Sequence, residues 1–321
     1  MHLPAIECRT RQGPGAAAAL VLALVAALAV LVGQATPAAA QAAPPRDDSV
    51  DEPVIMIHGF HERPYLGDPV PWGYDCADWW KAARGAMTAQ GWTGELRTYG
   101  YYQSDENCDW YYTNDTPDEA KQARLGDRNT PLTDVAQDLA WKIYRSYSSK
   151  GKSVDVMAHS MGGLVIRSAL TEVSKGNPWF PPHLYVEDVV TYGTPHAGTT
   201  VSALCGNRFN RFNQCDEMQV NSAFLQNQIQ NPQGAHGTDW TLFGSDFDYF
   251  VPARSATGME ADHKVIYDRS ARINHQSLHA ITDGTYGMRY INTPNARWTH
   301  DDTGAAPVRA GTNSLYWHKA W

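Results

Sequence analysis

VDVMAHSMGG, residues 154–163, is the stretch of sequence that decides the fold. Its first four residues form a short, mostly apolar run that predicts a buried strand, and a helix is predicted from Gly162 to about Val173. A strand that turns this abruptly into a helix strains the backbone of the residue at the bend, Ser160, and pushes its side chain outward. Ala158 and Gly162 suit the turn, because bulky side chains there would collide across it. The helix dipole also favours developing negative charge at this position. The pattern therefore indicates a nucleophilic serine rather than one that merely caps a helix.

Strands and helices alternate on both sides of this turn. Further strands are predicted at 54–57, 96–99, 186–192 and 240–243, and further helices at 78–90, 131–147 and 218–229. This alternation predicts βαβ units and a largely parallel sheet. Residues 101–129 are polar and aromatic and are predicted to form a long surface excursion, and residues 286–321 have no clear period.

Three segments resemble the α/β-hydrolase superfamily, and within it the secreted bacterial lipases and esterases. They are Val54–Phe60, the Ala-His-Ser-Met-Gly-Gly turn at 158–163, and Thr191–Gly198, which is similar to the Gly-Thr-Pro-His-x-Gly loop of lipases. Ala158 replaces the usual first glycine of the turn. The resemblance spans roughly Pro53–His279. It implies an α/β-hydrolase fold, with a mostly parallel central sheet, helices on both faces and loop insertions.

The resemblance also implies catalytic residues in the chain order serine, acid, histidine. The acid is expected after the strand at 240–243, where Asp246 and Asp248 are available. The family often has its acid three residues before a Val-Pro pair, which favours Asp248. The base is expected later, at His275, which matches the family's loop histidine, or at His279. The predicted triad is therefore Ser160, Asp248 and His275, with Asp246 and His279 as alternatives.

An oxyanion hole is predicted at the end of the first strand. His58-Gly59-Phe60 follows that strand, which is where the oxyanion loop lies in this fold. The predicted donors are the backbone N–H groups of Phe60 and Met161. The alternative for His58-Gly59 is a simple turn that ends the strand.

Several histidines and aromatic residues are predicted near the substrate. His159 and His196 precede the acid in the chain, so they are interpreted, with His58 and Trp110, as substrate-binding residues. Aromatic residues gather in the segments around the oxyanion loop and predict either a rim for an apolar ester or surface packing. These aromatic residues are Trp72, Tyr74, Trp79, Trp80, Tyr101, Tyr102, Trp110, Tyr111 and Tyr112.

The first 43 residues are typical of a secretory signal peptide. Arg9 and Arg11 precede an unbroken apolar run at 16–32, and small residues at 36–40 offer a cleavage site. The alternative is an uncleaved membrane anchor. Residues 44–321 are then one catalytic domain, exported to an extracellular location.

Four cysteines remain after the predicted cleavage, an even number that suits an oxidising compartment. Three pairings are possible, and the sequential one, Cys76–Cys108 and Cys205–Cys215, is favoured because each bridge closes a local loop. A metal site is the alternative interpretation, but no Cys-x-x-Cys spacing supports it.

These features predict a serine hydrolase that cleaves carboxylic esters, a lipase or carboxylesterase. The net charge of −8 gives no electrostatic reason to bind nucleic acid. We expect no metal and no cofactor, a monomer, and an ester or lipid substrate, including one at a lipid interface. The alternatives are an acyltransferase that uses the same triad, a non-catalytic binding protein on a hydrolase scaffold, and a peptidase.

Overall fold

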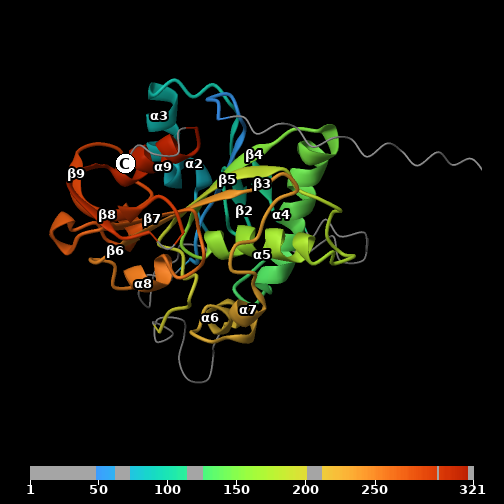
Figure 1. Cartoon of the computed structure of the whole chain (residues 1–321). Helices are drawn as coiled ribbons and strands as arrows, with labels where there is room; N and C mark the ends of the chain where they lie inside the picture. The colour runs from blue at the N-terminus through green and yellow to red at the C-terminus, as the bar shows by residue number, and fades with distance from the viewer. Residues whose placement is uncertain (1–47, 62–72, 114–125, 201–211, 295, 317–321) are drawn as a thin grey trace, which may run out of the picture. The chain divides into compact units, whose positions relative to one another are not determined.

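The computed structural model describes residues 48–61, 73–113, 126–200, 212–294 and 296–316. Within these residues a nine-stranded sheet has the order β3-β2-β1-β4-β5-β6-β7-β8-β9 (Figure 1). Neighbouring strands are parallel from β3 to β7, whereas β8 and β9 are antiparallel to their neighbours. The strands are β1 (Val54–Ile57), β2 (Leu96–Gly100), β3 (Trp110–Tyr111), β4 (Val154–His159), β5 (Val186–Tyr192), β6 (Asp239–Ser245), β7 (His263–Tyr267), β8 (Thr285–Ile291) and β9 (Thr299–Ala305). The predicted fold class, α/β with a mostly parallel sheet, is confirmed.

The middle of the sheet is buried on both faces. Every residue of β1, β4 and β5 is buried. β4 pairs with β1 on one side and β5 on the other, and Ile57 lies opposite Ala158. Parallel strands need this double cover. β1 is apolar throughout, whereas β4 and β5 also contain buried polar residues, among them Asp155 and Glu187. The strand before Ser160 is therefore held on both edges and both faces.

Helices cover the two faces of the sheet (Figure 1). Leu139 of α4 and Leu164 of α5 belong to the apolar cluster that contains Ile57 on one face. Met87 of α3 and Val308 of α9 belong to the cluster that contains Met56 on the other. The helices are α2 (Cys76–Trp79), α3 (Lys81–Ala89), α4 (Leu132–Ser146), α5 (Gly162–Ser174), α6 (Asn213–Glu217), α7 (Ala223–Asn227), α8 (Ala253–Ala256) and α9 (Pro307–Ser314), with 3-10 turns η2 (Ser148–Lys150), η4 (Arg269–Ala271) and η5 (His275–Ser277).

Two predicted helices differ from the structure. The helix expected at 78–90 begins earlier, because the side chain of Asp75 caps α2 by accepting from the backbone N–H of Asp78, and it is interrupted at Trp80. Of the helix expected at 218–229, only residues 223–227 are helical, as α7. The preceding α6 ends at Glu217, and Asn221, with a φ of 62°, lies between the two helices.

The predicted surface excursion at 101–129 is wrong for its first half. Tyr101, Tyr102 and Asp105 are buried, and β3 adds a short parallel strand beside β2. Residues 114–125 lie outside the described part of the chain. The segment at 286–321, which had no predicted structure, supplies most of β8, together with β9 and α9.

No helix among the described residues has both the length and the apolar character that crossing a bilayer requires.

Candidate active site

Ser160 lies at the sharp turn between β4 and α5. Its φ of 53° is in the left-handed region, which residues other than glycine rarely adopt. Its N–H donates to the carbonyl of Tyr192 at 2.8 Å, and its own carbonyl accepts from the Thr194 hydroxyl at 2.7 Å. A Cβ at Gly162 would lie 2.4 Å from the carbonyl oxygen of His58. The turn is thus fixed from several sides, and it requires glycine at position 162.

His275 lies beside this serine, 115 residues further along the chain. Its Nε2 is 2.9 Å from Ser160 Oγ, and its Nδ1 is 2.7 Å from Asp248 Oδ2. A neutral ring that donates from Nδ1 to the carboxylate keeps its Nε2 lone pair for the serine proton. Gly193 leaves room for this ring, since a Cβ there would lie 3.0 Å from His275 Nδ1. The arrangement is that of a nucleophile with an oriented base.

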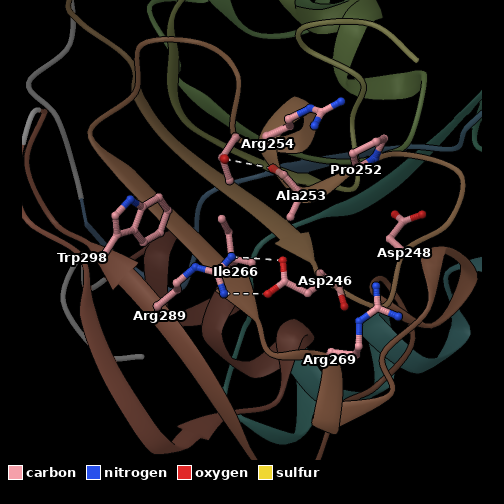
Figure 2. A pocket seen from close by; sticks show the side chains of 11 residues that line it. Asp246, Asp248, Pro252, Ala253, Arg254, Ile266, Arg269, Arg289 and Trp298 are labelled. Carbon is pink, nitrogen blue, oxygen red and sulfur yellow. Dashed lines mark hydrogen bonds and ion pairs between the residues drawn. The ribbon is translucent and has the colours of Figure 1, made fainter. Parts of the chain in front are cut away.

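The two candidate acids lie in different surroundings. Oδ1 of Asp248 accepts from the backbone N–H groups of Phe250 and Val251, at 2.8 and 2.9 Å, which leaves Oδ2 for His275. Asp246 instead forms a two-pronged ion pair with Arg289, at 2.7 and 3.0 Å. Figure 2 shows this pair in a cavity of about 550 Å³; Asp248 also lines that cavity but lies apart from the Asp246–Arg289 pair, beside Pro252. The structure therefore brings Asp248, and not Asp246, to the imidazole.

Two further histidines pack around His275. His159 donates from Nε2 to the backbone carbonyl of His275 at 2.9 Å. Burial, followed by the neighbouring His279 and His275, lowers the pKa of His159 well below its usual value. His279 stacks on Trp79 at 4.2 Å, and burial, followed by the charge of His275, lowers its pKa to about 3. Both rings are therefore neutral near pH 7, and among these three histidines only His275 reaches Ser160.

A cavity of about 40 Å³ opens at Ser160. Apolar and polar residues contribute in equal number to its lining, which consists of Phe60, His159, Ser160, Pro195, Thr199, Met218, Phe250, Val251, His275 and Gln276. A Cβ at Gly59 would lie 2.6 Å from Ser160 Cβ, so the loop after β1 lies directly against the serine. The backbone N–H groups of Phe60 and Met161 donate to no other group within the described residues. Met161 directly follows Ser160, and Phe60 follows Gly59, which lies against Ser160; both positions suit the predicted oxyanion donors.

Three of the predicted substrate-binding residues do not line this cavity, whereas His159 does. His58 is fully buried, with Nε2 2.9 Å from Asp105 Oδ2. His196 is buried, with Nε2 3.1 Å from Thr191 Oγ1. Trp110 packs under the guanidinium of Arg97 at 5.3 Å.

Most of the aromatic residues near the oxyanion loop are packing residues. Trp72 lies outside the described residues. The buried members of the set are Tyr74, Trp80, Tyr101, Tyr102 and Tyr112. Their burial favours the packing interpretation over an aromatic rim.

Asp105 is a site residue that the sequence analysis missed. It follows β2, and His58 follows the neighbouring parallel strand β1. The carboxyl ends of neighbouring parallel strands meet at one edge of the sheet, where ligands bind in open α/β folds. This placement, and not any local motif, is the signal that could have paired the two residues.

The predicted disulfide Cys76–Cys108 is present, with 4.9 Å between the Cα atoms. The second predicted pair involves Cys205, which lies outside the described residues. In the described part of the chain, no three side chains of His, Cys, Asp or Glu are grouped so that they could hold a metal ion.

Comparison with protein families identifies the chain. The model for the PGAP1-like alpha/beta domain matches residues 95–279, which include Ser160, Asp248 and His275. The chain belongs to the PGAP1-like α/β domain family. None of the curated proteins matches the sequence significantly.

Solved structures similar to this PGAP1-like chain are lipases and esterases of low sequence identity. The mature lipase BlEst2 of Bacillus licheniformis is 16% identical, with 63% of this chain and 69% of that chain covered and a TM-score of 0.37. Lipase B of Aspergillus fumigatus is 12% identical, with 74% of this chain but 52% of that chain covered and a TM-score of 0.42. The esterase domain of a Rhodothermus marinus protein is 16% identical, with 75% and 84% covered and a TM-score of 0.37.

Proposed function

We propose that this PGAP1-like chain is a serine hydrolase that cleaves carboxylic esters through an acyl-enzyme. The observation that carries the proposal is the continuous contact from Ser160 Oγ through the His275 ring to Asp248, at 2.9 and 2.7 Å. A serine hydroxyl is a weak nucleophile until a base takes its proton, and this contact supplies an oriented base.

The mechanism follows from the roles of the three groups. His275 Nε2 takes the Ser160 proton as Oγ attacks the ester carbonyl, and Asp248 holds the ring in the tautomer that leaves Nε2 free. The backbone N–H groups of Phe60 and Met161 stabilise the oxyanion. His275 then returns the proton to the leaving alcohol. Water attacks the acyl-enzyme with the same ring as base, which releases the acid and restores Ser160.

The apolar residues of the cavity lining suit a hydrocarbon acyl group. Phe60, Met218, Phe250 and Val251 surround the serine and offer no charged partner to a substrate. We therefore propose esters of apolar acids as substrates. Hydrolysis rates for p-nitrophenyl esters from acetate to palmitate would establish the preferred acyl length.

Export through a cleaved signal peptide at 1–43 is also part of the proposal, with 44–321 as a single catalytic domain. The disulfide Cys76–Cys108 supports it, because such bonds persist in oxidising compartments.

The test of the proposed chemistry is the variant Ser160→Ala. We expect a loss of kcat of about 10,000-fold or more for p-nitrophenyl butyrate, the scale seen when a triad member is removed. A fluorophosphonate probe is expected to label the wild-type protein at Ser160 and to leave Ser160→Ala unlabelled. Ser168→Ala is the matched control, since Ser168 is buried within α5, outside the cavity, and is expected to leave labelling unchanged. Hydrolysis that persists in Ser160→Ala would overturn the proposal.

A further inference from the structure

A buried carboxylate lies under the loop that follows β1. Asp105 accepts four hydrogen bonds: Oδ1 from the N–H of Tyr74 at 2.7 Å, and Oδ2 from the N–H groups of Tyr101 and Tyr102, at 2.6 and 2.7 Å, and from His58 Nε2 at 2.9 Å. Burial on its own would raise the pKa of Asp105, but the facing His58 and the backbone donors outweigh it, so the pKa lies below its usual value. The group is therefore an ionised carboxylate with a full set of donors.

The imidazole of His58 joins this carboxylate to the oxyanion loop. Its second nitrogen, Nδ1, lies 2.9 Å from the carbonyl oxygen of Gly59. The two ring nitrogens thus face two acceptors, the carboxylate of Asp105 and the carbonyl of Gly59. The contact with Asp105 therefore orients the ring that faces Gly59 O. The ring is stacked on Tyr101 at 4.2 Å, which fixes its plane.

The carbonyl of Gly59 decides where the Phe60 N–H points. The two groups belong to one planar trans peptide unit and point in opposite directions. Gly59 O is held by His58 Nδ1 and also by the hydroxyl of Tyr101, at 2.7 Å. The Tyr74 hydroxyl holds the next carbonyl, that of Phe60, at 2.9 Å. His58, Tyr74 and Tyr101, which all hydrogen-bond to Asp105, therefore hold the carbonyls of Gly59 and Phe60 on either side of the Phe60 N–H, the predicted oxyanion donor.

The segment that carries Asp105 is itself fixed. The disulfide Cys76–Cys108 closes it, and Cys76 N–H donates to the carbonyl of Glu106 at 2.9 Å. A Cβ at Gly100 would lie 2.5 Å from Cys108 Sγ and 3.0 Å from the Asp105 side chain. Glycine at the end of β2 thus lets the carboxylate approach the sheet edge where His58 lies.

From these contacts we infer that Asp105 is a positioning residue for the oxyanion hole, acting through His58 and the Gly59 carbonyl on the Phe60 N–H. The inference rests on the proposed esterase function. In Asp105→Asn an amide replaces the carboxylate that faces His58 Nε2, so the ring loses the partner that orients it toward Gly59 O. The peptide between Gly59 and Phe60 is then held less firmly, with Tyr101 as the remaining contact on Gly59 O, and the transition state loses part of the support of one donor while substrate binding is unaffected.

The test compares Asp105→Asn with Asp109→Asn in the full chain. Asp109 directly follows Cys108 and accepts from the N–H and hydroxyl of Thr98, at 2.8 and 3.0 Å, without touching His58. For p-nitrophenyl butyrate we expect Asp105→Asn to lower kcat about 10- to 100-fold with KM within about twofold, since one oxyanion donor supports about 100- to 1,000-fold in rate. Asp109→Asn is expected to keep the wild-type kcat, whatever it does to the melting temperature.

A second pair of variants covers the case in which Asp105→Asn does not fold. Tyr101→Phe removes only the hydroxyl that holds the carbonyls of His58 and Gly59. Tyr99→Phe removes a neighbouring hydroxyl that instead bonds Asp138 at 2.7 Å. We expect about a 10-fold lower kcat, again with little change in KM, for Tyr101→Phe alone.

The outcomes separate this inference from the proposed function. A wild-type protein that neither hydrolyses the ester nor reacts with a fluorophosphonate at Ser160 contradicts the proposed function itself. An active wild type with unchanged kcat in Asp105→Asn and in Tyr101→Phe overturns only the positioning role. A raised KM at unchanged kcat also overturns it, because it would assign Asp105 to substrate binding.

Discussion

Three imidazoles lie together at the candidate site, and burial lowers the pKa of two of them, His159 and His279, below the usual value for histidine. The pKa of His279 is lowered to about 3. His275 is set apart from them by its two polar partners, Ser160 and Asp248. A buried histidine that stays neutral in the folded chain but takes up a proton when unfolded makes the fold sensitive to acid.

The sign of this effect is fixed by the direction of the shift. The unfolded chain binds a proton at His279 below about pH 6.5, whereas the folded chain does so only near the lowered value of about 3. The free energy of unfolding should therefore fall as the pH drops from about 6.5 to about 3, by up to about 1.4 kcal/mol per pH unit for each such histidine.

His279→Gln should make this fall shallower in urea unfolding measured between pH 6.5 and 4.5. His300→Asn is the control, because His300 is exposed and hydrogen-bonded to Asp268, and its pKa is raised rather than lowered. A slope in His279→Gln equal to that of the wild type would show that this imidazole is not kept neutral by the fold.

The residues that the sequence could identify are those marked by a local pattern. Ser160 is marked by the strand before it and the small residues around it, and Asp248 by its spacing from Val251-Pro252. Asp105 has no such mark, because its role depends on β1 and β2 being neighbours in the sheet. The match to the family's loop histidine favours His275 over His279 as the base, and His275 is the ring that contacts Ser160.

At the scale of elements, the junction between β4 and α5 has a strict steric demand. The position of Gly162, at the first residue of α5, is bounded by the carbonyl oxygens of His58 and Ile57, at 2.4 and 2.6 Å from a Cβ placed there. Gly85, inside α3, would have nothing within 4 Å of an added Cβ. The same substitution should therefore have opposite effects in the two helices.

Gly162→Ala should lower the free energy of unfolding by about 1–3 kcal/mol and abolish most ester hydrolysis, because backbone atoms must move at the turn that holds Ser160. Gly85→Ala should raise the free energy of unfolding by about 0.5–1 kcal/mol at unchanged kcat. Thermal unfolding and p-nitrophenyl butyrate assays of both variants provide the check. Wild-type kcat in Gly162→Ala would mean that the turn tolerates a side chain.

Elements with a continuous apolar sequence were predictable, and elements defined by tertiary contacts were not. β1 has the predicted bounds because it is a buried parallel strand that is apolar throughout, and β5 has them because its apolar residues end at Gly193-Thr194-Pro195. The interruption at Trp80 has no local signal, since that side chain is buried against the sheet. β9 reads Thr-His-Asp-Asp-Thr-Gly-Ala and is largely exposed, so its sequence lacks the alternation that indicates a strand.

At the scale of the whole molecule, the proposed export predicts two properties of the mature chain, its first residue and the state of its cysteines. Protein recovered from the medium should have an intact mass that corresponds to a start between Gln41 and Pro44. Its four cysteines should resist alkylation until they are reduced, since the predicted pairs are Cys76–Cys108 and Cys205–Cys215. Mass spectrometry with and without reduction measures both quantities. An uncleaved chain, or a thiol that reacts before reduction, would contradict this account.

The strand order places β3 and β9 at the two edges of the described sheet, and neither is a good template for pairing with another strand. At one, β3 is only two residues long, and at the other, β9 presents His300, Asp301 and Asp302. An unpaired strand becomes a template for another copy when it is long, flat and apolar, and charge or shortness prevents this. Neither edge strand therefore favours pairing with the sheet of another copy of the chain. The strand order thus disfavours fibrous aggregation of the folded chain, even in a concentrated solution.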